Sequence, residues 1–340
     1  MSTLASQLRA SLVYVNGYCL IPVFILGIIG NITNMIVFSQ GRLKNNGCSL
    51  YFVIVSLIHI FVLCFGCIVR IVITLSGFDL SHFSLFFCKC RVYFFVAGVV
   101  LSRFYLCLIC IDRWLITSLN ARTRRLSNVK TIRRIILVST ILWLLFHLHV
   151  GIGFRIEISG CVPSSDGFYS TFYLITNLSF SIIPFIIIIL FTTLTLHRII
   201  IKKRVGNKRN PIVHPVERNN HQSNSQNTMN DLDERLSNRN LQLIKLNIIQ
   251  VIFFILLNLP NTIYTLYSFI TKTNQKTNDQ ITIDNFFNYV ASSLLYTHCA
   301  YGIRRVNGTH THSVNPDQIA VKILRNKMKA RILAVSFLIN

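Results

Sequence analysis

The stretch "LCLICIDRWLIT", residues 106–117, places an acid beside a base between two apolar runs. A charged group within a bilayer is costly, so it usually faces the interior of a helical bundle or lies near the membrane interface. Asp112 and Arg113 therefore mark either the end of a membrane span or a polar site inside one. The sequence around them decides between these readings.

The composition indicates a membrane protein, because 52% of the 340 residues are hydrophobic and only 13% are charged, against about 25% charged in soluble domains. Six stretches contain no Asp, Glu, Lys or Arg and are long enough to cross a bilayer as helices: 10–41, 45–69, 135–154, 167–197, 246–271 and 285–303. A seventh apolar stretch, about 85–111, is interrupted by Lys89, Arg91 and Arg103.

Only helices and closed barrels satisfy their backbone polar groups within lipid. The length of these stretches therefore predicts an all-α membrane protein, a seven-transmembrane-helix bundle. We expect its helices near residues 17–40, 49–75, 85–117, 133–154, 169–202, 239–271 and 284–303.

The formal net charge of +23 would suggest nucleic-acid binding in a soluble protein. Here the basic residues gather between spans. The 113–134 loop has seven bases and no acid, and the 198–245 loop has ten bases and four acids. The positive-inside rule places such loops in the cytoplasm. We therefore expect the N-terminus outside, the C-terminus inside and no nucleic-acid partner.

This topology divides the chain into three parts. Residues 1–16 form a short extracellular N-terminus, residues 17–303 the transmembrane domain, and residues 304–340 a cytoplasmic tail that is partly disordered. The third cytoplasmic loop, about 204–238, is rich in Asn, Gln and Ser, a composition that cannot bury a core and favours disorder.

Three of the ten cysteines lie on the outer side of this topology, at Cys88, Cys90 and Cys161. That side is oxidising, so a disulfide between two of them is plausible. The sequence does not choose the pair.

Several motifs recur along the spans in a fixed order. The third span has a cysteine 25 residues before Arg113, and the sixth contains "FFILLNLP" at residues 253–260. Together these positions resemble the rhodopsin-like (class A) G-protein-coupled receptors over about residues 17 to 300. The matching positions are Gly30, Asn31, Leu57, Cys88, Asp112, Arg113, Trp114, Trp143, Cys161, Pro184, Phe254 and Pro260.

The chain also departs from that family's pattern, as a divergent member with an atypical seventh span and C-terminus. Phe61 stands where the family has Asp, Thr192 where it has Tyr, and Asn258 where it has Trp. The Asn-Pro-x-x-Tyr motif of the seventh span is missing, and "NPDQI" at 315–319 lies in a polar stretch. These departures affect positions that the family uses for switching.

The resemblance implies a multi-pass plasma-membrane receptor that transduces an extracellular ligand to a heterotrimeric G protein. It implies a disulfide between Cys88 and Cys161. It also implies a switch in which Arg113 is held by Asp112 at rest and released to meet the G protein. The residues carried over to this switch and its coupling are Asp112, Arg113, Trp114, Phe254, Asn258 and Pro260.

Arg103 stands ten residues before Arg113, about 15 Å along a helix and near the middle of the bilayer. With Asn31 and Asn258 it forms a predicted polar core. We hypothesise a contact between Arg103 and Asn258. The alternative is that Arg103 reaches water in a cavity without a particular partner.

A ligand pocket would open outward between the helices, lined by apolar and a few polar groups. Amine receptors carry an Asp seven residues after the third-span cysteine, where this chain has Phe95, so the ligand is a peptide or another non-amine molecule. The candidate pocket residues are Arg70, Arg91, Phe94, Phe95, Tyr173, Asn261 and Tyr264.

No enzymatic site, cofactor site or metal site is predicted. Two alternatives to a signalling receptor stay open. One is a receptor-like seven-helix protein with impaired or no signalling, because Phe61, Thr192 and Asn258 differ from the family's switching residues and the Asn-Pro-x-x-Tyr motif is missing. The other is a membrane transporter, against which the spans carry no acidic relay.

Overall fold

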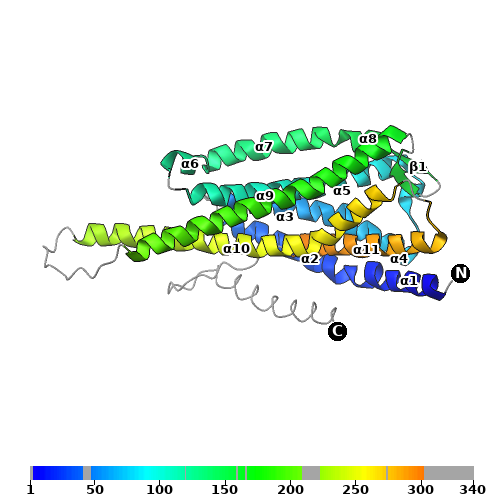
Figure 1. Cartoon of the computed structure of the whole chain (residues 1–340), viewed down its shortest axis with the longest axis horizontal. Coiled ribbons are helices and arrows are strands. Elements are labelled where there is room, and N and C mark those ends of the chain that lie inside the picture. Colours follow the sequence, from blue (N-terminus) through cyan, green and yellow to red (C-terminus); the bar gives the residue numbers. More distant parts are fainter. Residues whose placement is uncertain are drawn as a thin grey trace. The chain divides into compact units, whose positions relative to one another are not determined.

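The computed structural model describes residues 3–40, 47–118, 120–157, 160–164, 167–208, 223–272 and 275–301, which form a helical bundle (Figure 1). The predicted tail at 304–340 lies outside these residues. The elements in chain order are α1 (Thr3–Val13), η1 (Tyr14–Tyr18), α2 (Leu20–Ser39), α3 (Gly47–Val62), η3 (Leu63–Cys67), α4 (Ile68–Ser76), η4 (Leu80–His82), α5 (Leu85–Ile116), α6 (Ala121–Arg125), α7 (Val129–Phe146), α8 (Leu148–Gly153), β1 (Phe154–Glu157), β2 (Gly160–Pro163), α9 (Gly167–Lys208), α10 (Ser223–Ile270) and α11 (Asn278–Ala300).

The predicted seven-transmembrane-helix bundle is confirmed. Within the described residues, six helical stretches are long and apolar enough to cross a membrane, and α11 is the seventh, more polar helix. The sequence analysis predicts six uncharged spans that include the seventh, 285–303, and treats the third as interrupted by charged residues. In the structure the third span passes the test of length and hydropathy, and α11 is the helix that is too polar for it. The six stretches are Ala10–Ser39, Gly47–Ser76, Leu85–Ile116, Val129–Gly153, Phe168–Ile201 and Ile244–Ile270.

The helices pack in a closed ring in the order α2, α3, α5, α9, α10, α11 and back to α2, while α7 packs against α3 and α5. Small residues allow this close approach, as is usual between helices in lipid. A Cβ atom on Gly98 of α5 would lie 2.8 Å from the Val62 side chain of α3. The third span, α5, therefore lies at the centre of the packing.

Two turns of π-helix interrupt the first two spans. η1 joins α1 to α2, and η3 joins α3 to α4 without ending the helix. A π turn accommodates one extra residue and occurs frequently at functional sites. In η3, Leu63, Gly66 and Cys67 are buried, so this turn faces the bundle interior.

Two helices begin more than ten residues before their predicted bounds. The first begins at Thr3 rather than near residue 17, and α10 begins at Ser223 rather than near residue 239. The predicted third loop, about 204–238, thus includes the end of α9 and the start of α10, while residues 209–222 lie outside the described part. Helix formation propagates one hydrogen bond per added residue once a turn exists, so a polar segment can continue an apolar helix.

The connection between α8 and α9 is an antiparallel hairpin of β1 and β2. Its register pairs Ile156 with Cys161. Ser84 caps the N-terminus of α5 by accepting a hydrogen bond from the Phe87 backbone N–H at 3.3 Å. Together the cap and the hairpin position the start of α5 and Cys161 at the same end of the bundle.

Candidate functional site

Asp112 and Arg113 form a buried ion pair near the C-terminal end of α5. Arg113 Nη2 lies 2.6 Å from Asp112 Oδ2, and the two residues are 0% and 3% exposed. Ser127 donates a hydrogen bond to the other carboxylate oxygen, Oδ1. Within the described residues, Nε and Nη1 of Arg113 have no hydrogen-bond partner. The pair is therefore desolvated and its basic member is only partly satisfied.

Trp114 connects this end of α5 to α9. Its backbone carbonyl accepts a hydrogen bond from Arg198 Nη1 at 3.1 Å, and the Arg198 guanidinium lies 4.3 Å from the Trp114 ring centroid. The sequence did not single out Arg198. A base 14 residues after Pro184, at the end of a long span, was the available signal.

Arg103 and Asn258 do not bond to one another, which corrects the hypothesis made from the sequence. Arg103 Nη1 donates to Ser181 Oγ at 2.9 Å and approaches the Phe180 carbonyl at 3.5 Å, both on α9. Asn258 Nδ2 instead donates to the Phe254 carbonyl of its own helix at 3.1 Å. A long guanidinium reaches a neighbouring helix, whereas the short amide of Asn258 is satisfied by the preceding turn.

Asn31 ties α2 to α11. Its Nδ2 donates to the Cys299 carbonyl at 3.0 Å and to the Gly27 carbonyl at 2.9 Å, and the side chain is fully buried. The third predicted member of the polar core thus bonds to the seventh helix and not to Arg103.

In the second span, the two residues that were matched to interior positions of the family lie on the outer face of the helix. Leu57 and Phe61 are 39% and 46% exposed, so neither faces the interior. His59 is the buried polar residue there, and its ring lies 5.5 Å from that of His298 on α11. Phe61 therefore does not occupy the position of an interior acid.

His59, His298 and Cys299 are also the group within the described residues whose ligand atoms could approach a metal ion. These atoms lie within 4.8 Å of one another. Ligand atoms around a bound zinc ion would be about 3.5 Å apart, so the group is not drawn together as in a formed site. We take it as a buried polar cluster.

Phe254 and Pro260 lie on α10, the sixth span. Phe254 is fully buried, with its ring 4.9 Å from Phe185 on α9 and 5.5 Å from His298 on α11. Pro260 lies inside the helix, which continues through it. A proline there removes a backbone hydrogen bond and permits a bend, so α10 has a weak point six residues beyond its buried contact with two neighbours.

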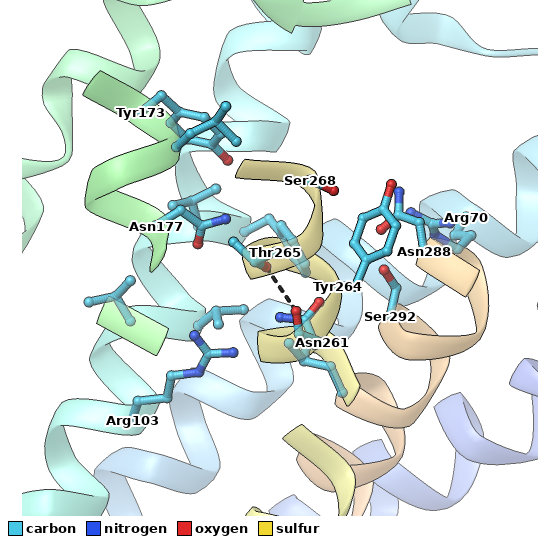
Figure 2. A pocket seen from close by; sticks show the side chains of 16 residues that line it. Arg70, Arg103, Tyr173, Asn177, Asn261, Tyr264, Thr265, Ser268, Asn288 and Ser292 are labelled. Carbon is cyan, nitrogen blue, oxygen red and sulfur yellow. Dashed lines mark hydrogen bonds between the residues drawn. The ribbon is translucent and has the colours of Figure 1, made fainter. Parts of the chain in front are cut away.

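A pocket of ≈ 270 Å³ lies between the spans (Figure 2). Of the seven candidates, five line it, namely Arg70, Phe95, Tyr173, Asn261 and Tyr264. The sequence did not identify several other polar lining residues, because no motif marks them. These are Asn177, Thr265, Ser268, Asn288 and Ser292, and Arg103 lines the pocket as well.

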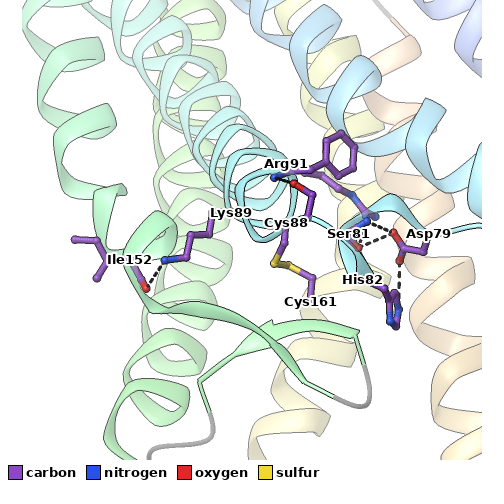
Figure 3. Close-up of a disulfide and its surroundings, with 10 residues drawn as sticks. Asp79, Ser81, His82, Cys88, Lys89, Arg91, Ile152 and Cys161 are labelled. Carbon is purple, nitrogen blue, oxygen red and sulfur yellow. Dashed lines mark hydrogen bonds and ion pairs between the residues drawn. A yellow bond between two sulfur atoms is a disulfide. The ribbon is translucent and has the colours of Figure 1, made fainter.

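Arg91 and Phe94 are not among the residues that line this pocket. Arg91 Nη1 lies 3.8 Å from Asp79 Oδ1 and 3.4 Å from Ser81 Oγ, at the end of the bundle near the disulfide (Figure 3). Phe94 is 38% exposed and stacks on Phe65 at 4.9 Å. Phe94 is displaced by about 100° around the helix from Phe95, whereas Arg91 lies one turn before Phe95 on the same side, beyond the pocket.

The disulfide joins Cys88 at the start of α5 to Cys161 on β2, with their Cα atoms 5.7 Å apart (Figure 3). Lys89 Nζ lies 3.4 Å from the Ile152 carbonyl on the adjacent α8. Cys90 has no disulfide partner. The hairpin is therefore fixed to the third span at the end opposite Asp112, which is 24 residues or about 36 Å along the helix.

The family model described as 7 transmembrane receptor (rhodopsin family) matches residues 30–301. No curated protein matches the sequence. The family match covers the six apolar spans from Gly30 onward and the whole of α11, and it confirms the resemblance derived from the motifs. The chain therefore belongs to the rhodopsin family of seven-transmembrane receptors.

Proposed function

We propose that this receptor transduces an extracellular, non-amine ligand to a heterotrimeric G protein across the plasma membrane. The observation that carries the proposal is the buried Asp112–Arg113 pair at the end of α5 opposite a pocket between the same helices. One helix thus links a binding cavity to a desolvated ion pair.

The pair has the properties of a two-state element. Removing one partner of a buried ion pair is strongly unfavourable, so the resting arrangement is well defined. Arg113 nevertheless keeps two nitrogen groups without a partner among the described residues. A conformation that offers Arg113 acceptors on another protein would compete with Asp112, and a ligand that favours that conformation would shift the population.

The sixth span, α10, is the element we expect to move. It packs against α9 and α11 and carries the internal proline at Pro260. Asn261, Tyr264 and Thr265, on the turns just after the proline, line the pocket. A ligand there contacts one side of the possible bend while Phe254 packs on the other, so binding and bending are coupled through one helix.

The orientation follows from the charge asymmetry of the loops. The basic 113–134 loop adjoins the Asp112 end, which we place in the cytoplasm. The disulfide end then faces the outside, where oxidising conditions favour the Cys88–Cys161 bond. Family members are normally not enzymes, and we assign no catalytic role to this chain.

The direct test is nucleotide exchange on purified G proteins by membranes that contain the full chain. We expect measurable basal or ligand-stimulated exchange with at least one G-protein class, and its loss in Arg113→Ala. Arg155→Ala, an exposed position on β1, is the matched control and should leave exchange unchanged. Equal exchange by the Arg113→Ala variant would refute the assigned role.

A receptor-like protein without signalling is the second candidate. It is favoured by Asn258, which stands where the family has Trp and whose amide, among the described residues, bonds within its own helix. Absence of exchange with every G-protein class, from protein shown to be folded at the cell surface, would support this candidate.

A further inference from the structure

We propose that the pocket binds a small ligand with two acidic groups, in its simplest form a dicarboxylate, one group held by Arg103 and the other by Arg70. This inference rests on the proposed function, because it names the class of ligand for the same pocket. It is carried by two cationic side chains, each of which has two nitrogen groups without a hydrogen-bond partner among the described residues.

Arg103 is the stronger of the two observations. The residue is 2% exposed and lines the pocket. Its Nη1 group bonds to α9, but Nε and Nη2 have no hydrogen-bond partner within the described residues. Figure 2 shows the guanidinium directed toward Asn177 and Asn261. A buried cation with two unused donors is costly unless an acceptor completes it.

Arg70 presents a second set of donors on the other side of the pocket (Figure 2). Its Nε and Nη1 groups have no hydrogen-bond partner in the described part of the chain. The guanidinium lies over the Tyr289 ring, 4.5 Å from the centroid, which orients it without neutralising its charge. Arg is suited to carboxylates because its planar fork can make two parallel hydrogen bonds.

The pocket wall supplies no counter-ion. None of the described residues that line it is Asp or Glu. The acids nearest in sequence to the lining residues Arg70 and Asn288 are paired with other bases. Asp79 Oδ1 lies 3.8 Å from Arg91 Nη1, and Asp284 Oδ2 accepts a hydrogen bond from Lys276 Nζ at 2.6 Å. Two positive charges therefore face one cavity, and a dianion would neutralise both.

The size and the walls of the cavity narrow the ligand further. At ≈ 270 Å³ the cavity lies just below the usual range for drug-sized ligands, which begins at about 300 Å³. Phe95, Val99 and Leu295 provide apolar wall, and Asn261 and Ser292 provide neutral donors and acceptors. A short carbon chain with an acid at each end fits this arrangement, with its apolar part between the two guanidinium groups.

The experiment measures binding without a G protein. The full chain is reconstituted in lipid nanodiscs, and its thermal unfolding is followed with a series of α,ω-dicarboxylates from malonate to suberate. The corresponding diamides are the uncharged controls, and 1,4-diaminobutane is the cationic control. At least one dicarboxylate should raise the unfolding temperature, and its diamide and the diamine should not.

The variants test which residues are responsible. Arg103→Gln and Arg70→Gln should each weaken the affinity for the best dicarboxylate by roughly 10- to 150-fold, the loss expected for a hydrogen bond to a charged group. The matched control is Arg91→Gln, because the Arg91 guanidinium faces Asp79 instead of the pocket. This variant should bind the dicarboxylate like the original chain. Arg103→Lys, which keeps the charge, should retain more binding than Arg103→Gln and guards against a folding defect.

Three results would overturn the inference. They are a wild-type chain that no dicarboxylate stabilises, equal stabilisation by the diamide, and full binding by both Gln variants. Nucleotide exchange measured in parallel separates the two proposals. Dicarboxylate binding without exchange would leave this inference standing and remove the G-protein function, whereas exchange driven only by an uncharged ligand would do the reverse.

Discussion

Substituting Asp112 with Asn tests the ion pair with almost no change in side-chain shape. The carboxylate accepts from Arg113 Nη2 at 2.6 Å and from Ser127 Oγ. Asn keeps one oxygen acceptor but removes the negative charge. The fully buried Arg113 would then keep its charge without a counter-ion.

The size of the effect follows from the burial of the pair. Deleting one partner of a buried ion pair costs roughly 3–5 kcal/mol. Because Asn still accepts a hydrogen bond, we expect a smaller loss of about 1.5–3 kcal/mol, the contribution of a hydrogen bond to a charged group. That energy corresponds to a shift of roughly 10- to 150-fold in the ratio of resting to released conformations. A released state populated at about 1% would rise to roughly 10–60%.

The assay is basal nucleotide exchange by membranes with matched receptor amounts, combined with thermal unfolding of the purified chain. We expect higher basal exchange and a lower unfolding temperature for Asp112→Asn. The double variant Asp112→Asn/Arg113→Ala should lose the exchange. Asp79→Asn removes a partly exposed acid at the other end of the bundle and serves as the matched control. Unchanged exchange together with an unchanged unfolding temperature would show that Asp112 does not restrain Arg113.

Three further predictions concern stability and can be checked by thermal or denaturant unfolding. Cys88→Ser opens a loop of 73 residues and should cost about 4 kcal/mol, an effect that reducing agent should reproduce in the original chain only. Asn31→Ala removes the bond to the Cys299 carbonyl and should cost about 0.5–1.7 kcal/mol, whereas an unchanged midpoint would show that this link does not hold α11. The hydrogen bond to Asp284 raises the pKa of Lys276 above its usual 10.5. The contribution of this pair to stability is therefore present below pH 10.5 and is lost as the pH rises through the folded-state pKa. Lys276→Met should abolish this loss of stability at alkaline pH.

The number of spans and the Asp112–Arg113 landmark could be predicted from the sequence, because they depend on local features. Apolar length determines whether a helix can cross lipid. A charged pair at the end of an apolar run, followed by a basic loop, marks the end of a span. Neither property requires knowledge of a partner far along the chain.

Contacts between spans could not be predicted in the same way. Arg103 bonds to Ser181, 78 residues away, and no pattern in the sequence distinguishes Ser181 from Asn258 as its partner. The second span shows the related problem of register. Leu57 and Phe61 keep the family's spacing, yet the helix presents His59 to the interior. Which face is buried depends on packing and not on spacing alone.

The pocket residues were predicted in part for the same reason. Arg70 and Arg91 are both bases near the end of a span, but Arg91 lies near Asp79 and Arg70 lines the cavity. The loop that carries Asp79 folds back onto α5 through η4. Its carboxylate, supplied by a loop, decides which of the two cations remains available to a ligand.

The π turn η3, at Leu63–Cys67, has a consequence for how this second span can diverge. It divides one continuous helix into two halves whose angular settings are independent, because one residue more or fewer in the turn rotates everything after it by about 100°. Loss of a single residue there would turn Arg70 out of the cavity and leave the half that carries His59 in place. Ligand preference could thus change by a one-codon deletion, without any substitution in the pocket and without disturbing the core below it.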